Sequence, residues 1–195
     1  MNITLIGMPG AGKSFVGEKL ARALGFHFVT PDKLLEQMHG ILLQQVLEKL
    51  GSEQFLDAEA DVVIAHTTGK NTLVISPGGS MIYRSRAMEH LKGISTIVYL
   101  ETPFTVIEKR VGKVPRGIVG LKNKTFAEVY AERIPLYERW ASLTVAGDQS
   151  PKAIISEITE RLRTHFKTYR NPKLRRIRGK NGADEEGVPR HSDRG

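Results

Sequence analysis

One motif near the start of the chain constrains its fold more than any other feature. Residues 7–14 read G-M-P-G-A-G-K-S; they follow a short apolar run and open a helical pattern over residues 13–24. Glycines let a loop curl so that successive backbone N–H groups point inward at an anion, and a helix that starts there adds its own N–H donors. The spacing matches the phosphate-binding loop G-x-x-x-x-G-K-[ST] in its required strand–loop–helix context.

This motif implies roles for its side chains. Lys13 is placed to reach the β- and γ-phosphates of a nucleotide, and the Ser14 hydroxyl to bind Mg²⁺. We therefore expect a nucleoside triphosphate to be bound by Gly7, Gly10, Ala11, Gly12, Lys13, Ser14 and Phe15. The sequence contains no N-K-x-D motif for reading a guanine base, which disfavours a GTPase, but it does not otherwise distinguish ATP from other triphosphates.

Apolar runs and helical patterns alternate along the chain. Strands are predicted over residues 3–6, 26–29, 72–75, 95–100 and 143–146. Helices are predicted over residues 13–24, 33–39, 42–50, 55–66, 103–111, 126–140 and 151–166, with the helix at 126–140 interrupted near Pro135. This alternation predicts an α/β fold with a mainly parallel five-stranded sheet flanked by helices.

Charge is distributed unevenly along the sequence. The formal net charge is +8, but residues 1–160 hold 18 basic and 17 acidic side chains, whereas residues 161–195 hold 11 basic and 4 acidic ones. The first part is nearly neutral and lacks the electrostatic footprint of a nucleic-acid-binding fold, so the basic tail must be judged by itself.

Composition excludes several classes of protein. The chain has no cysteine, which excludes disulfides, thiolate metal sites and a cysteine nucleophile. No apolar run approaches the roughly 18 residues of a membrane span, and the first residues read as a strand rather than a signal peptide. At 195 residues, one compact domain is expected. We therefore expect a soluble, cytoplasmic protein.

Beyond the phosphate loop, the chain resembles the shikimate kinase family over about residues 1–165. The matching features are the phosphate loop, Asp32 in a turn, Phe55 and Glu59, Pro77-Gly78-Gly79, Arg116 in a basic loop, and R-I-P-L-Y at residues 133–137. The last of these is the most specific. The resemblance implies a three-layer P-loop kinase domain at residues 1–169, with a mobile basic lid at about residues 112–124. Such a kinase transfers the γ-phosphoryl group of ATP to the 3-hydroxyl of shikimate, with Mg²⁺.

The resemblance also implies individual roles. Asp32 would accept the proton of the acceptor hydroxyl, and together with Lys13 and Arg116 it completes the implied catalytic set. Arg116 would fold over the triphosphate as part of the lid. Gly78 and Gly79 would let the acceptor approach the backbone. Arg133 would bind the acceptor carboxylate through its planar fork.

Four positions depart from the family pattern: Thr30, Leu56, Ser80 and Gly117. Thr30 replaces an aspartate that assists Mg²⁺ binding. Leu56 replaces an arginine that grips the acceptor carboxylate, a loss of about 1.5–3 kcal/mol. This change implies either acceptor binding weakened about ten- to a hundredfold or a different, less acidic acceptor. A shifted local register would let Arg84 or Arg86 substitute.

Simpler interpretations exist for the same residues. Asp32 also suits a helix N-cap, and Arg133 and the basic loop suit solvated surface positions. Glu59 is expected to orient a neighbour or to lie on the surface. Tyr137 and Trp140, three residues apart on a helix, are expected to pack in the core rather than to stack on a base.

The tail leaves a second class of function open. Residues 161–180 carry nine basic side chains and no acidic one, and residues 170–195 are expected to be a basic, disordered tail. In one interpretation this tail binds RNA, a membrane surface or an acidic partner. In the other, which we favour, it is a solubilising extension. The alternatives to a shikimate kinase are thus a kinase of another hydroxyl-bearing metabolite, or a nucleotide-dependent binding module whose tail contacts a partner.

Overall fold

The computed structural model describes residues 1–111 and 118–170, and the side chains of residues 1–111 and 118–164. The chain divides into two units, Met1–Glu157 and Ile158–Gly195. Part of the expected lid, residues 112–117, and nearly all of the expected tail, residues 171–195, lie outside the described residues. The predicted boundary at residues 169 and 170 stays a prediction.

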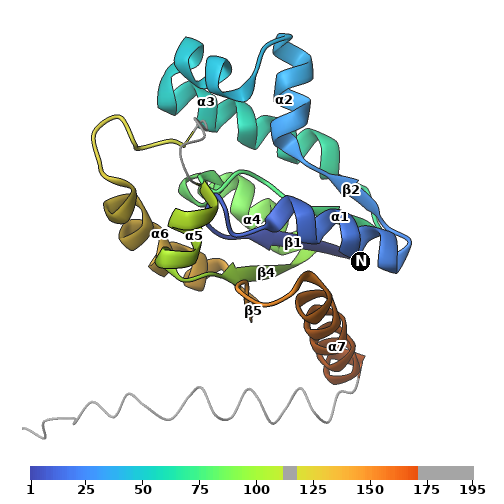
Figure 1. The fold of residues 1–195 in the computed structure, drawn as a ribbon. Coiled ribbons are helices and arrows are strands. Elements are labelled where there is room, and N and C mark those ends of the chain that lie inside the picture. Colours follow the sequence, from blue (N-terminus) through green and yellow to red (C-terminus); the bar gives the residue numbers. More distant parts are fainter. Residues whose placement is uncertain (112–117, 171–195) are drawn as a thin grey trace, which may run out of the picture. The chain divides into compact units, whose positions relative to one another are not determined.

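The first unit contains a five-stranded sheet in the order β2-β3-β1-β4-β5, in which every neighbouring pair is parallel (Figure 1). The strands are β1 (Asn2–Ile6), β2 (His27–Val29), β3 (Leu73–Ile75), β4 (Ser95–Glu101) and β5 (Leu143–Ala146). Strands β1 and β3 are buried along their whole length, which explains why they read as continuous apolar runs. The predicted α/β fold with a five-stranded parallel sheet is confirmed.

Seven α-helices and one 3₁₀ helix occur in the described part of the chain. They are α1 (Lys13–Leu24), α2 (Pro31–His39), α3 (Leu43–Thr67), η1 (Met81–Tyr83), α4 (Ser85–Ile94), α5 (Phe104–Val111), α6 (Phe126–Trp140) and α7 (Pro151–Arg170). No helix among the described residues is both long and apolar enough to cross a membrane.

Helices cover both faces of the sheet. Ile6 of β1 and Ile75 of β3 belong to a core that includes residues of α3, α4 and α6. Because side chains alternate along a strand, Leu5 faces the other side, and α1 packs there. Gly17 permits this approach, since a Cβ at residue 17 would lie 2.6 Å from Phe28 and 3.3 Å from Leu5. The expected three-layer arrangement follows.

Helices α2 and α3 form a pair with an apolar core of its own. Leu35 of α2 and Val46 and Leu56 of α3 are buried together in it. Figure 1 shows α2 and the first part of α3 at the top of the view, whereas Ala60 and Val63 in the later part of α3 pack in the core on the sheet. Within α3 the backbone of Gly51 is non-helical, with φ 74° and ψ 167°, so the expected break between residues 42–50 and 55–66 is present as a kink.

Two expectations about helices are wrong or incomplete. Helix α6 runs unbroken through Pro135, although proline removes one helical N–H. Arg133 and Tyr137, on either side of the proline, are both buried, so tertiary packing holds the two halves in line. Helix α4 was not predicted, although Ala87, Met88 and Leu91 form a helical spacing that faces the core.

The first residue of β1 connects it to β3. The Asn2 side chain is 1% exposed; its Oδ1 accepts a hydrogen bond from Leu73 N at 3.0 Å, and its Nδ2 donates to Lys70 O at 2.9 Å.

We expect Asn2→Ala to lower the free energy of unfolding by about 1–3 kcal/mol, because the buried N–H of Leu73 loses its acceptor. Asn71→Ala, at an exposed asparagine, is the matched control and should change it by about 0.5 kcal/mol at most. Urea denaturation measures both, and equal losses would contradict this account.

Candidate functional site

The loop between β1 and α1 has the backbone geometry of an anion-binding site. Gly7, Gly10 and Gly12 have φ angles of 145°, 87° and 93°, a region that favours glycine. Gly12 is the N-cap of α1 and offers no side chain to the first N–H groups of the helix. These donors, together with the positive end of the helix dipole, suit a phosphate.

Lys13 lies over this loop. Its side chain is largely buried, and Nζ donates to the carbonyl oxygens of Gly7 at 2.9 Å and Met8 at 3.1 Å. The ammonium group therefore stands next to the donors of the loop, where it adds a full positive charge to their partial charges.

A cavity of about 570 Å³ opens at the loop and extends toward α2, α3, the turn after β3 and α6. Nine residues predicted from the sequence line it: Gly10, Gly12, Lys13, Ser14, Phe15, Asp32, Gly78, Gly79 and Arg133. Gly7 and Ala11 belong to the loop without lining the cavity, and Arg116 lies outside the described residues. Residues far apart in the sequence thus meet at one site.

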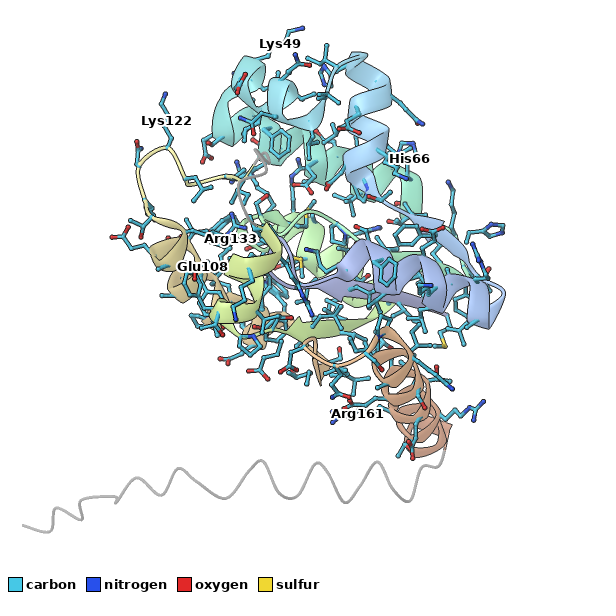
Figure 2. All side chains as sticks on the ribbon, viewed as in Figure 1. Lys49, His66, Glu108, Lys122, Arg133 and Arg161 are labelled. Atoms are coloured by element: carbon cyan, nitrogen blue, oxygen red, sulfur yellow. The ribbon has the colours of Figure 1, made fainter. Side chains whose placement is uncertain are left out.

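Arg133 is a buried side chain, so the interpretation as a solvated surface residue is wrong. It is 0% exposed; Nη2 donates to Val119 O at 2.8 Å, and Nε to the Tyr83 hydroxyl at 3.3 Å. Among the described residues Nη1 has no hydrogen-bond partner. In Figure 2 Arg133 lies within the molecule, whereas Lys49 and Lys122 extend from its surface. A buried guanidinium with one open position on a cavity suits an anionic ligand.

The turn after β3 brings the phosphate loop and Arg133 together. Glu59 Oε1 accepts a hydrogen bond from Gly78 N at 2.7 Å, and the Tyr137 hydroxyl donates to Gly79 O at 2.7 Å. A Cβ at residue 79 would lie 2.8 Å from Pro9 and 3.2 Å from Nη1 of Arg133. Glycine is therefore required here for close approach.

Asp32 and Glu59 form a pair of carboxyl groups on the cavity. Asp32 is half-buried in the first turn of α2, where Thr30 is the N-cap, so the interpretation of Asp32 as the N-cap is wrong. Glu59 is fully buried, which excludes the surface position considered for it. The two residues lie within hydrogen-bonding reach of each other.

Burial, and then the charge of Asp32, raise the pKa of Glu59 to about 8, against the lowering effects of the Gly78 N–H, Lys13 and Arg133. Burial also raises the pKa of Asp32, while nearby Lys13 lowers it. The site therefore contains two cations, Lys13 and Arg133. It also contains two carboxyl groups that do not readily ionise at the same time.

Leu56 does not line the cavity. It is buried in the α2–α3 core. The suggestion that Arg84 or Arg86 replaces the missing arginine is wrong: both pair with acidic residues of α3, Arg84 Nε with Asp57 at 2.8 Å and Arg86 with Asp61, and neither is among the described residues that line the cavity.

The described part of the expected lid is mixed in character. Ile118 and Val119 are buried and line the cavity, Lys122 is exposed, and Lys124 forms an ion pair with Glu132. Lys113 lies outside the described residues.

Several residues of the site were not predicted from the sequence. Glu36, Leu42, Leu43, Gln44 and Arg110 also line the cavity, and Ser76 Oγ lies 3.4 Å from Ser14 Oγ. Ser76 directly follows β3, and Arg110 lies on the helix after β4. Ligands of parallel α/β sheets bind at the carboxyl ends of the strands. The places of Ser76 and Arg110 after predicted strands could therefore have indicated them as site residues.

The chain also matches a known family over most of its length. The family model described as shikimate kinase matches residues 9–163. The chain belongs to the shikimate kinase family. Members of this family use ATP, generally with Mg²⁺.

Relatives of this family match nearly end to end. The shikimate kinase of Persephonella marina is 34% identical over 164 residues, which cover 83% of this chain and 99% of the relative. That of Mycobacterium avium is 35% identical over 162 residues, covering 81% and 91%.

Solved structures agree with the family assignment. Shikimate kinase from Acinetobacter baumannii in complex with shikimate superposes with a TM-score of 0.76 at 29% identity, covering 84% of this chain and 93% of that chain. Shikimate kinase from Aquifex aeolicus superposes with a TM-score of 0.71 at 30% identity, covering 85% and 98%.

The close fit of Glu59 against Gly78 generates a prediction. A Cβ at residue 78 would overlap Glu59 Oε1. We expect Gly78→Ala to lower the free energy of unfolding by about 1–3 kcal/mol, since Glu59 must leave the N–H it accepts. Gly93→Ala, at an exposed helical glycine with no atom within 4 Å of the added Cβ, should instead raise it by about 0.5–1 kcal/mol. Thermal or urea unfolding of the pair tests this, and a neutral Gly78→Ala would show that the turn is not constrained.

Proposed function

We propose that this chain is an ATP-dependent kinase that transfers the γ-phosphoryl group of ATP to the 3-hydroxyl of shikimate. One observation supports this most directly: a single cavity joins the phosphate loop to side chains whose buried polar atoms have no partner among the described residues. These atoms include Asp32 Oδ1 and Arg133 Nη1. Leaving such atoms unpaired costs about 1–3 kcal/mol each, which a polar ligand with hydroxyl and carboxylate groups would offset.

The nucleotide would bind at the loop end of the cavity. Backbone N–H groups of Gly10, Gly12 and the first turn of α1 would contact its phosphates, with Gly7, Ala11 and Phe15 completing the loop. Lys13 would leave the Gly7 and Met8 carbonyls to reach the β- and γ-phosphates. Arg116 retains the role that the resemblance implies for it, a lid arginine over the triphosphate.

Oxygen donors suited to Mg²⁺ lie at the same end. The hydroxyls of Ser14 and Ser76 are 3.4 Å apart, and Mg²⁺ prefers oxygen ligands and retained waters. These two residues would hold Mg²⁺, directly or through water, without the aspartate that Thr30 replaces. When bound, Mg²⁺ neutralises charge on the phosphates.

The acceptor would bind between Asp32 and Arg133. Nη1 of Arg133 would bind its carboxylate, and Gly78 and Gly79 would let its ring lie against the backbone. Asp32 would accept the proton of the hydroxyl while the oxygen bonds to the γ-phosphorus and the bond from phosphorus to the β–γ bridging oxygen breaks, releasing ADP.

The leucine at position 56 supports one alternative acceptor substrate. Leu56 is buried in the α2–α3 core, so the described arginines that line the cavity are Arg110 and Arg133, of which Arg133 has a buried nitrogen without a partner. A less acidic hydroxyl-bearing metabolite is therefore the second candidate acceptor. The binding-module alternative is disfavoured, since the cavity retains the phosphate loop with Asp32 and Arg133.

Asp32→Asn tests the proposed chemistry. Removing the proton acceptor should lower kcat by about 10²-fold or more, measured as ADP release from Mg·ATP with and without shikimate. Asp61→Asn, at an exposed aspartate on α3 that pairs with Arg86, is the control and should retain activity. Native protein that shikimate does not stimulate would point to another acceptor, and an active Asp32→Asn would remove Asp32 from the mechanism.

Arg133→Lys tests acceptor recognition. A lysine lacks the planar fork, so the KM for shikimate should rise about ten- to a hundredfold while the KM for ATP stays nearly constant. Arg139→Lys, on the exposed side of the same helix, should change neither constant. A parallel rise in both KM values for Arg133→Lys would instead indicate a general disturbance of the fold.

A further inference from the structure

Glu59 is a fully buried acidic residue for which the proposed function supplies no chemical role. Its Oε1 is accounted for by the hydrogen bond from Gly78 N at 2.7 Å. Its Oε2 has no hydrogen-bond partner among the described residues, although the side chain lines the cavity. A buried carboxylate oxygen without a donor is costly, so the protonation state of this group needs a physical explanation.

The cations near Glu59 donate to other acceptors, and Arg133 Nη1 has no partner among the described residues. Lys13 Nζ donates to two carbonyl groups of the phosphate loop, and Arg133 donates to Val119 O and to the Tyr83 hydroxyl. On α3 itself the neighbour one turn earlier, at the i−3 position, is the apolar Leu56. The helix that carries Glu59 thus supplies it with no positive charge at this position.

The groups that face Glu59 come from several elements. Lys13 lies on α1, Asp32 on α2 with Glu36 beside it, and Arg133 and Tyr137 on α6. The N–H of Gly78 faces it from the turn after β3. Among these groups Asp32 is itself short of a donor, since its Oδ1 has no partner among the described residues.

Two ionised carboxylates at this spacing offer acceptors only. Asp32 and Glu59 lie within hydrogen-bonding reach, so both charges together would repel and leave both free oxygens without a donor. One proton placed between them removes the repulsion and turns one oxygen into a donor for the other. A single proton thus satisfies two otherwise unpaired groups.

We propose that Glu59 remains a neutral carboxylic acid during the reaction and donates a hydrogen bond to ionised Asp32, which orients Asp32 toward the acceptor hydroxyl. Glu59 is then a positioning residue, and its proton takes the place of a cation on α3. This inference rests on the proposed function, because it assumes that Asp32 is the proton acceptor. No proton leaves Glu59 during the reaction.

The location of the proton follows from burial and charge. Glu59 is fully buried, whereas Asp32 is partly exposed on the cavity and lies nearer to solvent. Lys13 favours the ionised form of Asp32, and a hydrogen bond from Glu59 also lowers the pKa of Asp32. Burial raises the pKa of Glu59 well above its ordinary value. Both effects favour a proton on Glu59 and an ionised Asp32.

The first test observes the proton without measuring activity. Infrared spectroscopy of the whole protein at neutral pH should show a protonated-carboxyl C=O band that shifts in D₂O and is missing in Glu59→Gln. Glu89→Gln, at an exposed glutamate of α4, should leave the band in place. A native spectrum without this band, or a band that persists in Glu59→Gln, would overturn the proposal.

The second test uses the pH dependence of the kinase reaction. Glutamine keeps the acceptor for Gly78 N–H and a donor for Asp32, so Glu59→Gln should retain most of the activity that Glu59→Ala loses, a loss of about ten- to a hundredfold in kcat. Wild-type kcat should fall at alkaline pH, where Glu59 ionises, and Glu59→Gln should lack this fall. A purely structural role for Glu59 would leave the alkaline limb unchanged between the two proteins, which would overturn the proposal.

Stability gives a third readout that does not need the acceptor. Between the ordinary pKa of glutamate and its raised value of about 8, the native state binds a proton that the unfolded state does not. The free energy of unfolding of the wild type should therefore fall with rising pH relative to Glu59→Gln, and level off above that value. A flat difference across this range would contradict a proton on Glu59. Failure of shikimate to stimulate the wild type would instead count against the proposed function, while the infrared and stability results would still decide the state of Glu59.

Discussion

The turn after β3 is held from both sides by buried side chains, and the geometry of the cavity depends on it. Glu59 of α3 accepts the N–H of Gly78, and Tyr137 of α6 donates to the carbonyl of Gly79. Side chains from two helices therefore satisfy two backbone groups that no strand ladder pairs. With the turn held in this way, Gly79 lies against Pro9 of the phosphate loop. The turn and the phosphate loop therefore form adjoining parts of the cavity wall.

The interior around the cavity contains both a buried charged side chain, Arg133, and an apolar core, to which Leu56 belongs. Arg133 is fully buried and is stabilised by a carbonyl, a hydroxyl and the ring of Tyr83 at 5.2 Å. Leu56, where the family resemblance implies an arginine, instead contributes to the apolar core between α2 and α3. Leu56 therefore contributes apolar packing and no positive charge.

Some parts of this site were predictable because their signals are local. The phosphate loop depends on glycine positions and on one lysine within eight residues, and its strand and helix flank it directly in the sequence. The role of Asp32 as a cavity residue followed from a family motif rather than from any local pattern. Helix α4 was missed although its apolar spacing is regular, which is an error of interpretation and not a lack of signal.

The sequence by itself determined the phosphate loop, the α/β alternation and the family, because each is encoded by residues close together or in a specific order. Only the tertiary structure decided that Arg133 is buried, that Leu56 faces a core rather than the cavity, and that α6 continues through Pro135. Each of these depends on which face of a helix meets a partner from a distant part of the chain. Contacts of that kind are set by packing across the whole domain, and no short sequence window contains them.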